Sequence, residues 1–353
     1  MVAANGTGKD AAKAPRPETK KRINLGLQGG GSHGAFTWGV LDRLLDDERL
    51  MIDGISGTSA GALNAMILAT GYIKDGTAGA KQALRSFWES VSHISWLSPI
   101  QRTPTNVFLG NWSLENSPAY LALDLASRMF SPYDLNPFDI NPLRDIVDKH
   151  VDFDAVRACK NFQLFITATN VKSGAARVFT NKELTLDVAM ASACLPHIFK
   201  AVEVDGEPYW DGGYMGNPSL WPMFYGTEAV DIVIVQINPL RRDSAPRTAQ
   251  EIVDRINEIT FNASLLRELR AIDFVSRMLK EDRLDRKRYR DIHVHIIHDE
   301  EIAKLEASSK LNTEWNFLKY QFDLGRKTAG TWLSGTFDQI GKRTSVDLAA
   351  ILS

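Results

Sequence analysis

The sequence predicts an α/β fold in which a mostly parallel central sheet carries helices on both faces. Runs rich in Val, Ile and Leu alternate with helix-length segments along much of the chain, which is typical of βαβ units. The segment VDIVIVQINPL (230–240) is a nearly unbroken apolar run, as expected for a strand buried on both faces. With 353 residues, 44% of them hydrophobic, the chain is long enough to build a sizeable core.

The first predicted unit is a strand, a glycine-rich loop and a helix. Ile23, Leu25 and Leu27 alternate as in a strand, and the apolar residues of 36–45 recur at helical spacing. A second strand (51–57) leads into a helix of small residues that ends near Gly71. Another helix is expected over 81–96.

Further elements are predicted from the same patterns. Strands are expected at 162–171, 176–180, 230–240 and 291–299, with a hairpin over 201–213. A helix is expected over 184–196, ended by Pro196, and the chain is mostly helical from 246 onward.

We expect three parts: a disordered basic tail (1–22), a main domain (23–240) and a mostly helical region packed on it (241–353). Within the main domain, 99–142 is rich in Pro, Asn and aromatic residues. We expect this segment to be irregular and to form a lid or an insertion.

Composition limits the class of partner and compartment. The net charge of −2 does not favour nucleic-acid binding. Two cysteines, Cys159 and Cys194, are too few for a disulfide framework and indicate a reducing, cytoplasmic compartment.

The tail has no apolar signal region, and no apolar run is long enough to span a membrane. The basic residues of the tail and of 280–290, expected on a late helix, are either solvated or make transient contact with an anionic inner membrane surface. The oligomeric state is not indicated.

The second strand ends in Gly57-Thr58-Ser59-Ala60-Gly61, a G-x-S-x-G nucleophile elbow. A sharp strand-to-helix turn lifts the serine hydroxyl out of the sheet, and small neighbours are needed because the backbone folds back closely. The start of the following helix favours developing negative charge. Ser59 is therefore the candidate nucleophile.

The loop Gly29-x-Gly31-x-x-Gly34 admits two interpretations. Its spacing fits a dinucleotide-binding loop of an oxidoreductase, with Asp53 as the ribose-binding acid. It also fits an oxyanion hole, because consecutive glycines allow backbone N–H groups to converge on one oxygen. The end of the second strand, where the ribose acid belongs, holds the serine elbow, which favours the oxyanion hole.

Two routes supply a base for Ser59. Asp211 could act with one of His293, His295 or His298 in a Ser…Asp…His order. Alternatively, Asp211 acts alone, because the glycines that follow it form a tight turn that can approach the serine. Burial would raise the pKa of such a carboxyl towards a useful range.

The segments GGGSHG, GTSAG and DGG, in this order and linked by ASACLPHIFKAVEVDGEPYWDGG, resemble the patatin-like phospholipase family over about residues 23–240. The resemblance implies a three-layer patatin-like fold and a Ser–Asp dyad that needs no metal or organic cofactor. It implies Ser59 as nucleophile, Asp211 as base, and Gly29, Gly30 and Gly31 as oxyanion donors. The supporting motif residues are His33, Gly34, Gly57, Gly61, Gly212 and Gly213.

The expected function is hydrolysis of lipid carboxyl esters in phospholipids, lysophospholipids or neutral lipids. Acyl transfer and thioester hydrolysis use the same dyad and remain alternatives. One residue departs from the family pattern: Arg or Lys usually precedes the last glycine of the first loop, and this chain has His33. We interpret His33 as an accessory oxyanion or loop-orienting group, the alternative being a solvent-facing helix residue.

Overall fold

The computed structural model describes residues 20–242 and 244–353. Most of the expected tail lies outside these residues. Lys21 and Arg22, which we assigned to the tail, already belong to the first strand. Among the described residues, no helix combines the length and apolarity that crossing a membrane requires.

Within the described residues, eight strands form one sheet: β1 (Lys21–Leu27), β2 (Leu50–Gly57), β3 (Gln163–Asn170), β4 (Ala176–Thr180), β5 (Val202–Val204), β6 (Glu207–Asp211), β7 (Asp231–Val235) and β8 (His293–Ile297). The strand order is β5-β6-β3-β2-β1-β7-β8, with β4 also paired to β3. Strands β3, β2, β1, β7 and β8 are parallel, and the others pair in antiparallel fashion. The predicted fold class is confirmed, and the carboxyl ends of five strands meet at one edge.

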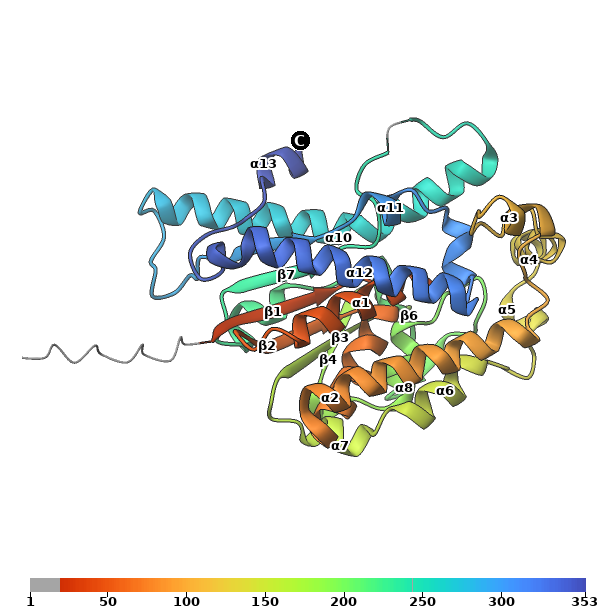
Figure 1. Cartoon of the computed structure of the whole chain (residues 1–353), viewed down its shortest axis with the longest axis horizontal. Helices are drawn as coiled ribbons and strands as arrows, with labels where there is room; N and C mark the ends of the chain where they lie inside the picture. The colour runs from red at the N-terminus through yellow and green to blue at the C-terminus, as the bar shows by residue number, and fades with distance from the viewer. Residues whose placement is uncertain (1–19, 243) are drawn as a thin grey trace, which may run out of the picture.

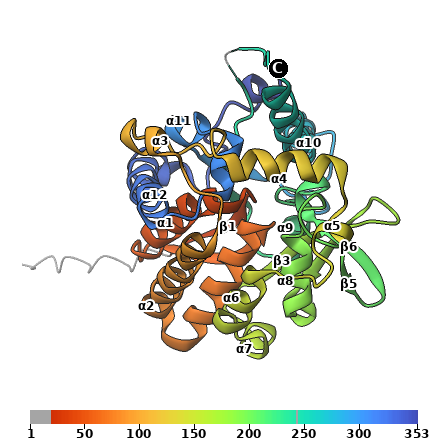
Figure 2. The same cartoon turned by 90° about the vertical axis from the view of Figure 1, so that its right-hand side faces the viewer.

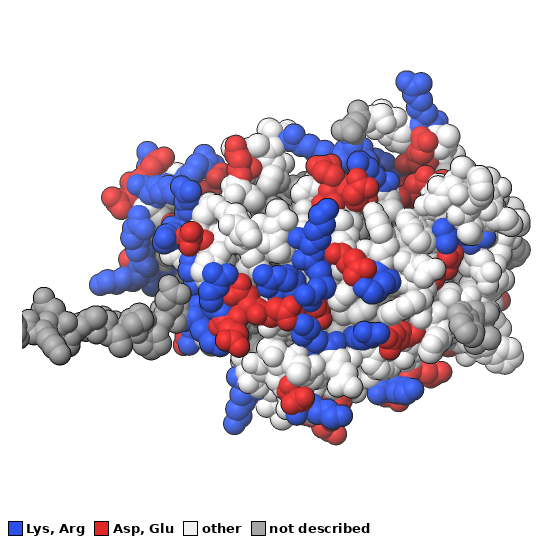
Figure 3. Space-filling view, in the orientation of Figure 1, with Lys and Arg blue, Asp and Glu red and all other residues white. Residues whose placement is uncertain are grey.

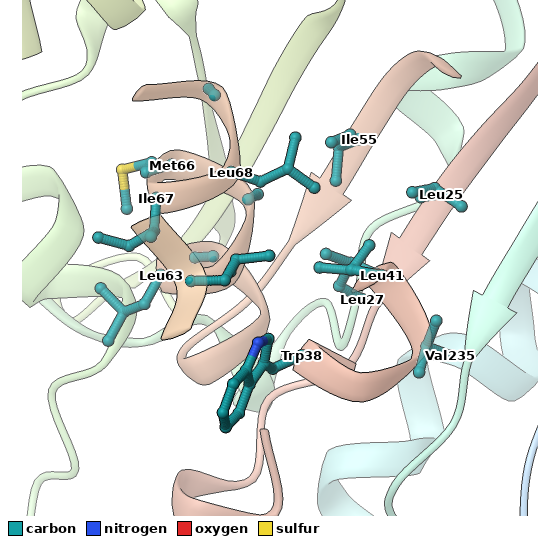
Figure 4. Close-up of a cluster of buried hydrophobic side chains, with 14 of the residues drawn as sticks. Leu25, Leu27, Trp38, Leu41, Ile55, Leu63, Met66, Ile67, Leu68 and Val235 are labelled. Atoms are coloured by element: carbon teal, nitrogen blue, oxygen red, sulfur yellow. The ribbon is translucent and has the colours of Figure 1, made fainter. Parts of the chain in front are cut away.

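Helices cover both faces of this sheet (Figure 1). One face carries α1 (Gly34–Leu45), α2 (Ala60–Leu97) and α12 (Trp315–Thr336), and the other carries α9 (Trp221–Gly226) and α10 (Ala249–Lys280). Strand β7 contributes to the core on both faces because its side chains alternate. Val233 and Val235 pack on the face of α1, α2 and α12, whereas Ile232 and Ile234 pack on the face of α9 and α10. Figure 4 shows the first cluster, where side chains of β1, β2 and β7 meet those of α1 and α2.

The two helices predicted within 60–96 form α2, whose helical geometry breaks at Asp75 and Gly76. The shorter helices are α6 (Pro142–His150), α7 (Phe153–Ala158), α8 (Leu186–Ser192), α11 (Glu300–Ala303) and α13 (Leu348–Leu352). Helix α8 ends at Ser192, so the predicted end at Pro196 was wrong by four residues. The basic run is not helical beyond Lys280, where α10 ends, and its remaining residues lead into β8 at the end of the molecule where charges of both signs mix (Figure 3).

The expectation that 99–142 is irregular was wrong. The segment contains α3 (Pro104–Phe108), α4 (Pro118–Met129) and α5 (Pro132–Leu135), each of which begins at a proline after Thr or Ser. Proline fits the first helical position because its fixed φ is helical and its missing N–H has no partner there. Figure 2 shows α4 lying across the carboxyl edge of the sheet.

Helices α1 and α12 pack so closely that their crossing requires glycine. A Cβ added to Gly325 would lie 2.2 Å from the carbonyl oxygen of Phe36. A Cβ added to Gly39 would lie 2.0 Å from the carbonyl oxygen of Phe322. We expect Gly325→Ala to lower the free energy of unfolding by about 1–3 kcal/mol, because the helices must separate to admit the methyl group.

Gly335 provides a control on the same helix, since a Cβ there meets nothing within 4 Å. Gly335→Ala should leave the protein unchanged or stabilise it by about 0.4–1 kcal/mol, through a less flexible unfolded chain. Urea unfolding of the two variants checks this. Equal stabilities would show that α1 and α12 do not depend on this close approach.

Candidate active site

Ser59 occupies a strained turn between β2 and α2. Its φ of 52° and ψ of −124° are unusual for a residue with a side chain. A Cβ on Gly61 would lie 2.2 Å from the carbonyl oxygen of Leu27, so only glycine fits where the turn passes β1. The Ser59 N–H donates to Ser192 Oγ at 3.0 Å, and the residue is 9% exposed. Gly57 closes the same turn against the Gly61 backbone.

Asp211 is the last residue of β6 and is fully buried. Its Oδ1 accepts the Gly213 N–H at 2.7 Å, whereas Oδ2 has no hydrogen-bond partner among the described residues. Burial raises the pKa of Asp211 to about 6, although the Gly213 N–H, the Ser59 hydroxyl and Lys310 each act to lower it. Gly212 and Gly213 begin the next turn, with Gly212 against the β3 backbone. The predicted nucleophile and base are thus neighbours.

The Gly29–Gly31 loop lies directly on this serine turn. A Cβ on Gly29 would be 2.6 Å from Ser59 Cβ. The Gly29 N–H donates to Asn217 Oδ1 at 2.6 Å, so it is already satisfied. The N–H groups of Gly30 and Gly31 meet no acceptor in the part of the chain that the structure describes. Gly34 begins α1 beside Ala60.

Asp53 is not placed to bind a ribose, as the dinucleotide interpretation of the glycine loop would require. Asp53 lies within β2, not at its carboxyl end, and its Oδ2 accepts the N–H groups of Glu228 and Ala229 at 2.7 and 2.8 Å.

The late histidines are not brought to Ser59. His293 and His295 both contact Asp231 Oδ1, at 3.2 and 3.0 Å, and Asp231 and His293 pair where β7 and β8 begin. Ser59 lies at the opposite edge, where the parallel strands end. His298 lies beyond β8 and is 3.7 Å from Glu300. None of them contacts Asp211, so the structure does not assemble the histidine-containing triad.

His33 is buried, so the solvent-facing alternative was wrong. It belongs to the short helix η1 (Gly31–His33), and its Nε2 lies 2.7 Å from Ser309 Oγ. The Ser309 hydroxyl donates to the Glu306 carbonyl, so Nε2 carries the proton and donates to Ser309. Burial, with help from Lys310 and Arg242, lowers the pKa of His33 well below its usual value. The ring is therefore neutral, which fits a loop-orienting group better than a cationic one.

Buried polar residues that belong to none of the three sequence motifs hold the glycine loop in place. Gln28 Oε1 accepts the backbone N–H groups of Ile237 and Asn238 at 2.9 Å each, and Asn238 Nδ2 donates to the Gly29 carbonyl at 2.7 Å. Asn217 holds the other side of Gly29. The sequence holds one signal: both asparagines directly precede a proline.

The chain is similar to one known protein family and to several solved structures. A model of the family "Patatin-like phospholipase" matches residues 25–223. VipD from Legionella pneumophila is 15% identical, with 88% of this chain and 67% of that chain covered and a TM-score of 0.32. ExoU, in its complex with SpcU from the type III secretion system of Pseudomonas aeruginosa, is 17% identical, with coverages of 88% and 52% and a TM-score of 0.31. The chain thus spans about one half to two thirds of the length of these solved chains.

No curated protein sequence matches the chain. The family model, however, covers more than half of it and includes the glycine loop, Ser59 and Asp211. The chain belongs to the patatin-like phospholipase family.

Proposed function

We propose that the protein is a serine acyl hydrolase that cleaves lipid carboxyl esters through an acyl-enzyme on Ser59, with Asp211 as the base. The observation that carries this proposal is the buried Asp211 carboxyl, which interacts with the hydroxyl of Ser59, a serine held on a strained turn. Membership of the patatin-like phospholipase family supports a lipid substrate.

In the first step, Ser59 Oγ attacks the ester carbonyl carbon while its proton passes to Asp211. The resulting oxyanion accepts hydrogen bonds from the N–H groups of Gly30 and Gly31, at the start of α1. The C–O bond then breaks, and Asp211 returns the proton to the departing alcohol. Asp211 then takes a proton from water, which attacks the carbonyl carbon of the acyl-enzyme. The bond to Ser59 Oγ breaks, Asp211 returns the proton to Ser59 Oγ, and the fatty acid is released.

We further propose that the helices α3 to α5 form the surface by which the enzyme contacts lipid. Helix α4 buries none of its residues, and Phe108 and Phe138 are 89% and 85% exposed. Other exposed apolar residues of this segment are Val107, Leu109, Leu121, Leu125, Met129, Phe130, Tyr133, Leu135 and Ile140. Figure 3 shows few charges at this end of the molecule. An apolar face of this size beside the site suits transient contact with a membrane surface.

Ser59→Ala and Asp211→Asn should each lower kcat for ester hydrolysis by about 10⁴-fold or more, because each removes a member of one reacting unit. Hydrolysis of p-nitrophenyl butyrate measures this, with circular dichroism to verify folding. His298→Ala is the control and should retain wild-type activity. A folded Asp211→Asn enzyme with normal kcat would eliminate Asp211 as the base.

The pH dependence of kcat/KM should follow the ionisation of Asp211. The base must be deprotonated to accept the Ser59 proton, so activity should rise with pH and reach half its maximum at about pH 6. A profile that stays flat down to pH 5 would contradict the raised pKa.

Exchanging both Phe108 and Phe138 for serine should weaken binding to phosphatidylcholine vesicles roughly 10- to 100-fold, because two exposed aromatic rings no longer enter the lipid. Hydrolysis of p-nitrophenyl butyrate should be unchanged. Ile73→Ser, an exposed apolar position of α2, is the matched control for co-sedimentation with vesicles. Equal vesicle binding by the wild type, the double phenylalanine variant and Ile73→Ser would place the lipid contact elsewhere.

A further inference from the structure

Lys310 lies against the glycine loop although it is 279 positions later in the chain than Gly31. It belongs to the short helix η4 (Ala307–Leu311). Gly31 has a φ of 57°, and a Cβ there would be 2.4 Å from the Lys310 carbonyl oxygen. The Lys310 ammonium donates to Asn238 Oδ1 at 2.8 Å, and the same asparagine donates to the Gly29 carbonyl.

This position brings a positive charge to a loop that otherwise lacks one. His33 is the basic residue of the loop itself, and it is neutral because its ring is buried. His33 still has a part in the arrangement, since its bond to Ser309 fixes the residue that precedes Lys310. The loop therefore holds η4 through an uncharged hydrogen bond and receives a charge from the next residue.

The charged groups around Lys310 leave this charge only partly compensated. Asp254 and Glu258 of α10 face it, together with Arg242 and Asp211. Glu258 is already paired with Arg242 and Arg255, at 2.5 and 3.0 Å. No carboxylate of the described residues forms a salt bridge with Lys310 itself.

We propose that Lys310 is the cation of the oxyanion loop, stabilising the negative charge that develops beside Gly30 and Gly31 and the charged form of Asp211. It is a positioning residue, because it acts through its field and through Asn238 and not by contact with the substrate. This inference rests on the proposed acyl hydrolase function.

Two pH effects follow from this role. Lys310 acts to lower the pKa of Asp211, so its loss should move the acid limb of kcat/KM above the wild-type value of about 6. Burial lowers the pKa of Lys310 below its usual 10.5, so the wild-type enzyme should lose activity on the alkaline side as the ammonium deprotonates. Arginine stays charged across this range.

The test compares Lys310→Met and Lys310→Arg on p-nitrophenyl butyrate, an uncharged ester. We expect Lys310→Met to lower kcat roughly 10- to 100-fold with little change in KM. In its pH profile of kcat/KM, the acid limb should move to higher pH and the alkaline limb should be absent. Lys310→Arg should restore most of kcat and move the alkaline limb to higher pH. Lys304→Met, an exposed lysine of the same region, should behave as wild type.

Wild-type kcat and unchanged limbs in folded Lys310→Met would overturn the proposal, as would an equally defective Lys310→Arg. If Lys310→Met does not fold, Lys310→Gln decides, because its amide N–H can still donate to Asn238 Oδ1 while the charge is removed. The acid limb should then move to higher pH, and an unmoved limb with wild-type kcat would overturn the proposal. Failure of the function itself is distinguishable, since Ser59→Ala would then hydrolyse the ester as fast as wild type.

Discussion

The contact between the Gly29 loop and the Ser59 turn is the constraint on which the site depends. Strands β1 and β2 are parallel neighbours that end level, with Leu27 opposite Gly57, so their following turns must share one small space. The space is so narrow that Gly29 and Gly61 cannot carry side chains. The positive φ of Ser59 costs about 1–3 kcal/mol, and the packing of both turns must offset this cost.

Buried polar side chains keep this contact in place. Asn217 and Asn238 bind the N–H and the carbonyl of Gly29, respectively, and Gln28 connects the ends of β1 and β7. Each bond satisfies a group that would be costly to bury alone. The N–H of Gly29 is used in this contact. Of the three glycines that we expected to donate to an oxyanion, the proposed donors are therefore Gly30 and Gly31.

The sequence predicted the parts of the fold and site that carry a local pattern. The apolar strands and the turns around Ser59 and Asp211 need particular residues at adjacent positions, so they can be found in the chain. The prolines of 104–132 led to the wrong expectation of an irregular segment, because proline can either end a helix or begin one. The serine or threonine before each of these prolines is the sign that a helix begins there. Lys310 had no signal, since a single lysine in a polar stretch is ordinary and its role comes from tertiary contact.

The short helix η4 joins three parts of the molecule because of its geometry. A 3₁₀ helix has three residues per turn, so consecutive side chains point about 120° apart. Ser308 accepts the Leu114 N–H at 3.1 Å, between α3 and α4 of the exposed apolar segment. Ser309 contacts His33, and Lys310 contacts Asn238. One turn of backbone therefore supports both the apolar face and the glycine loop, so a shift of either one acts directly on the residues that hold the other.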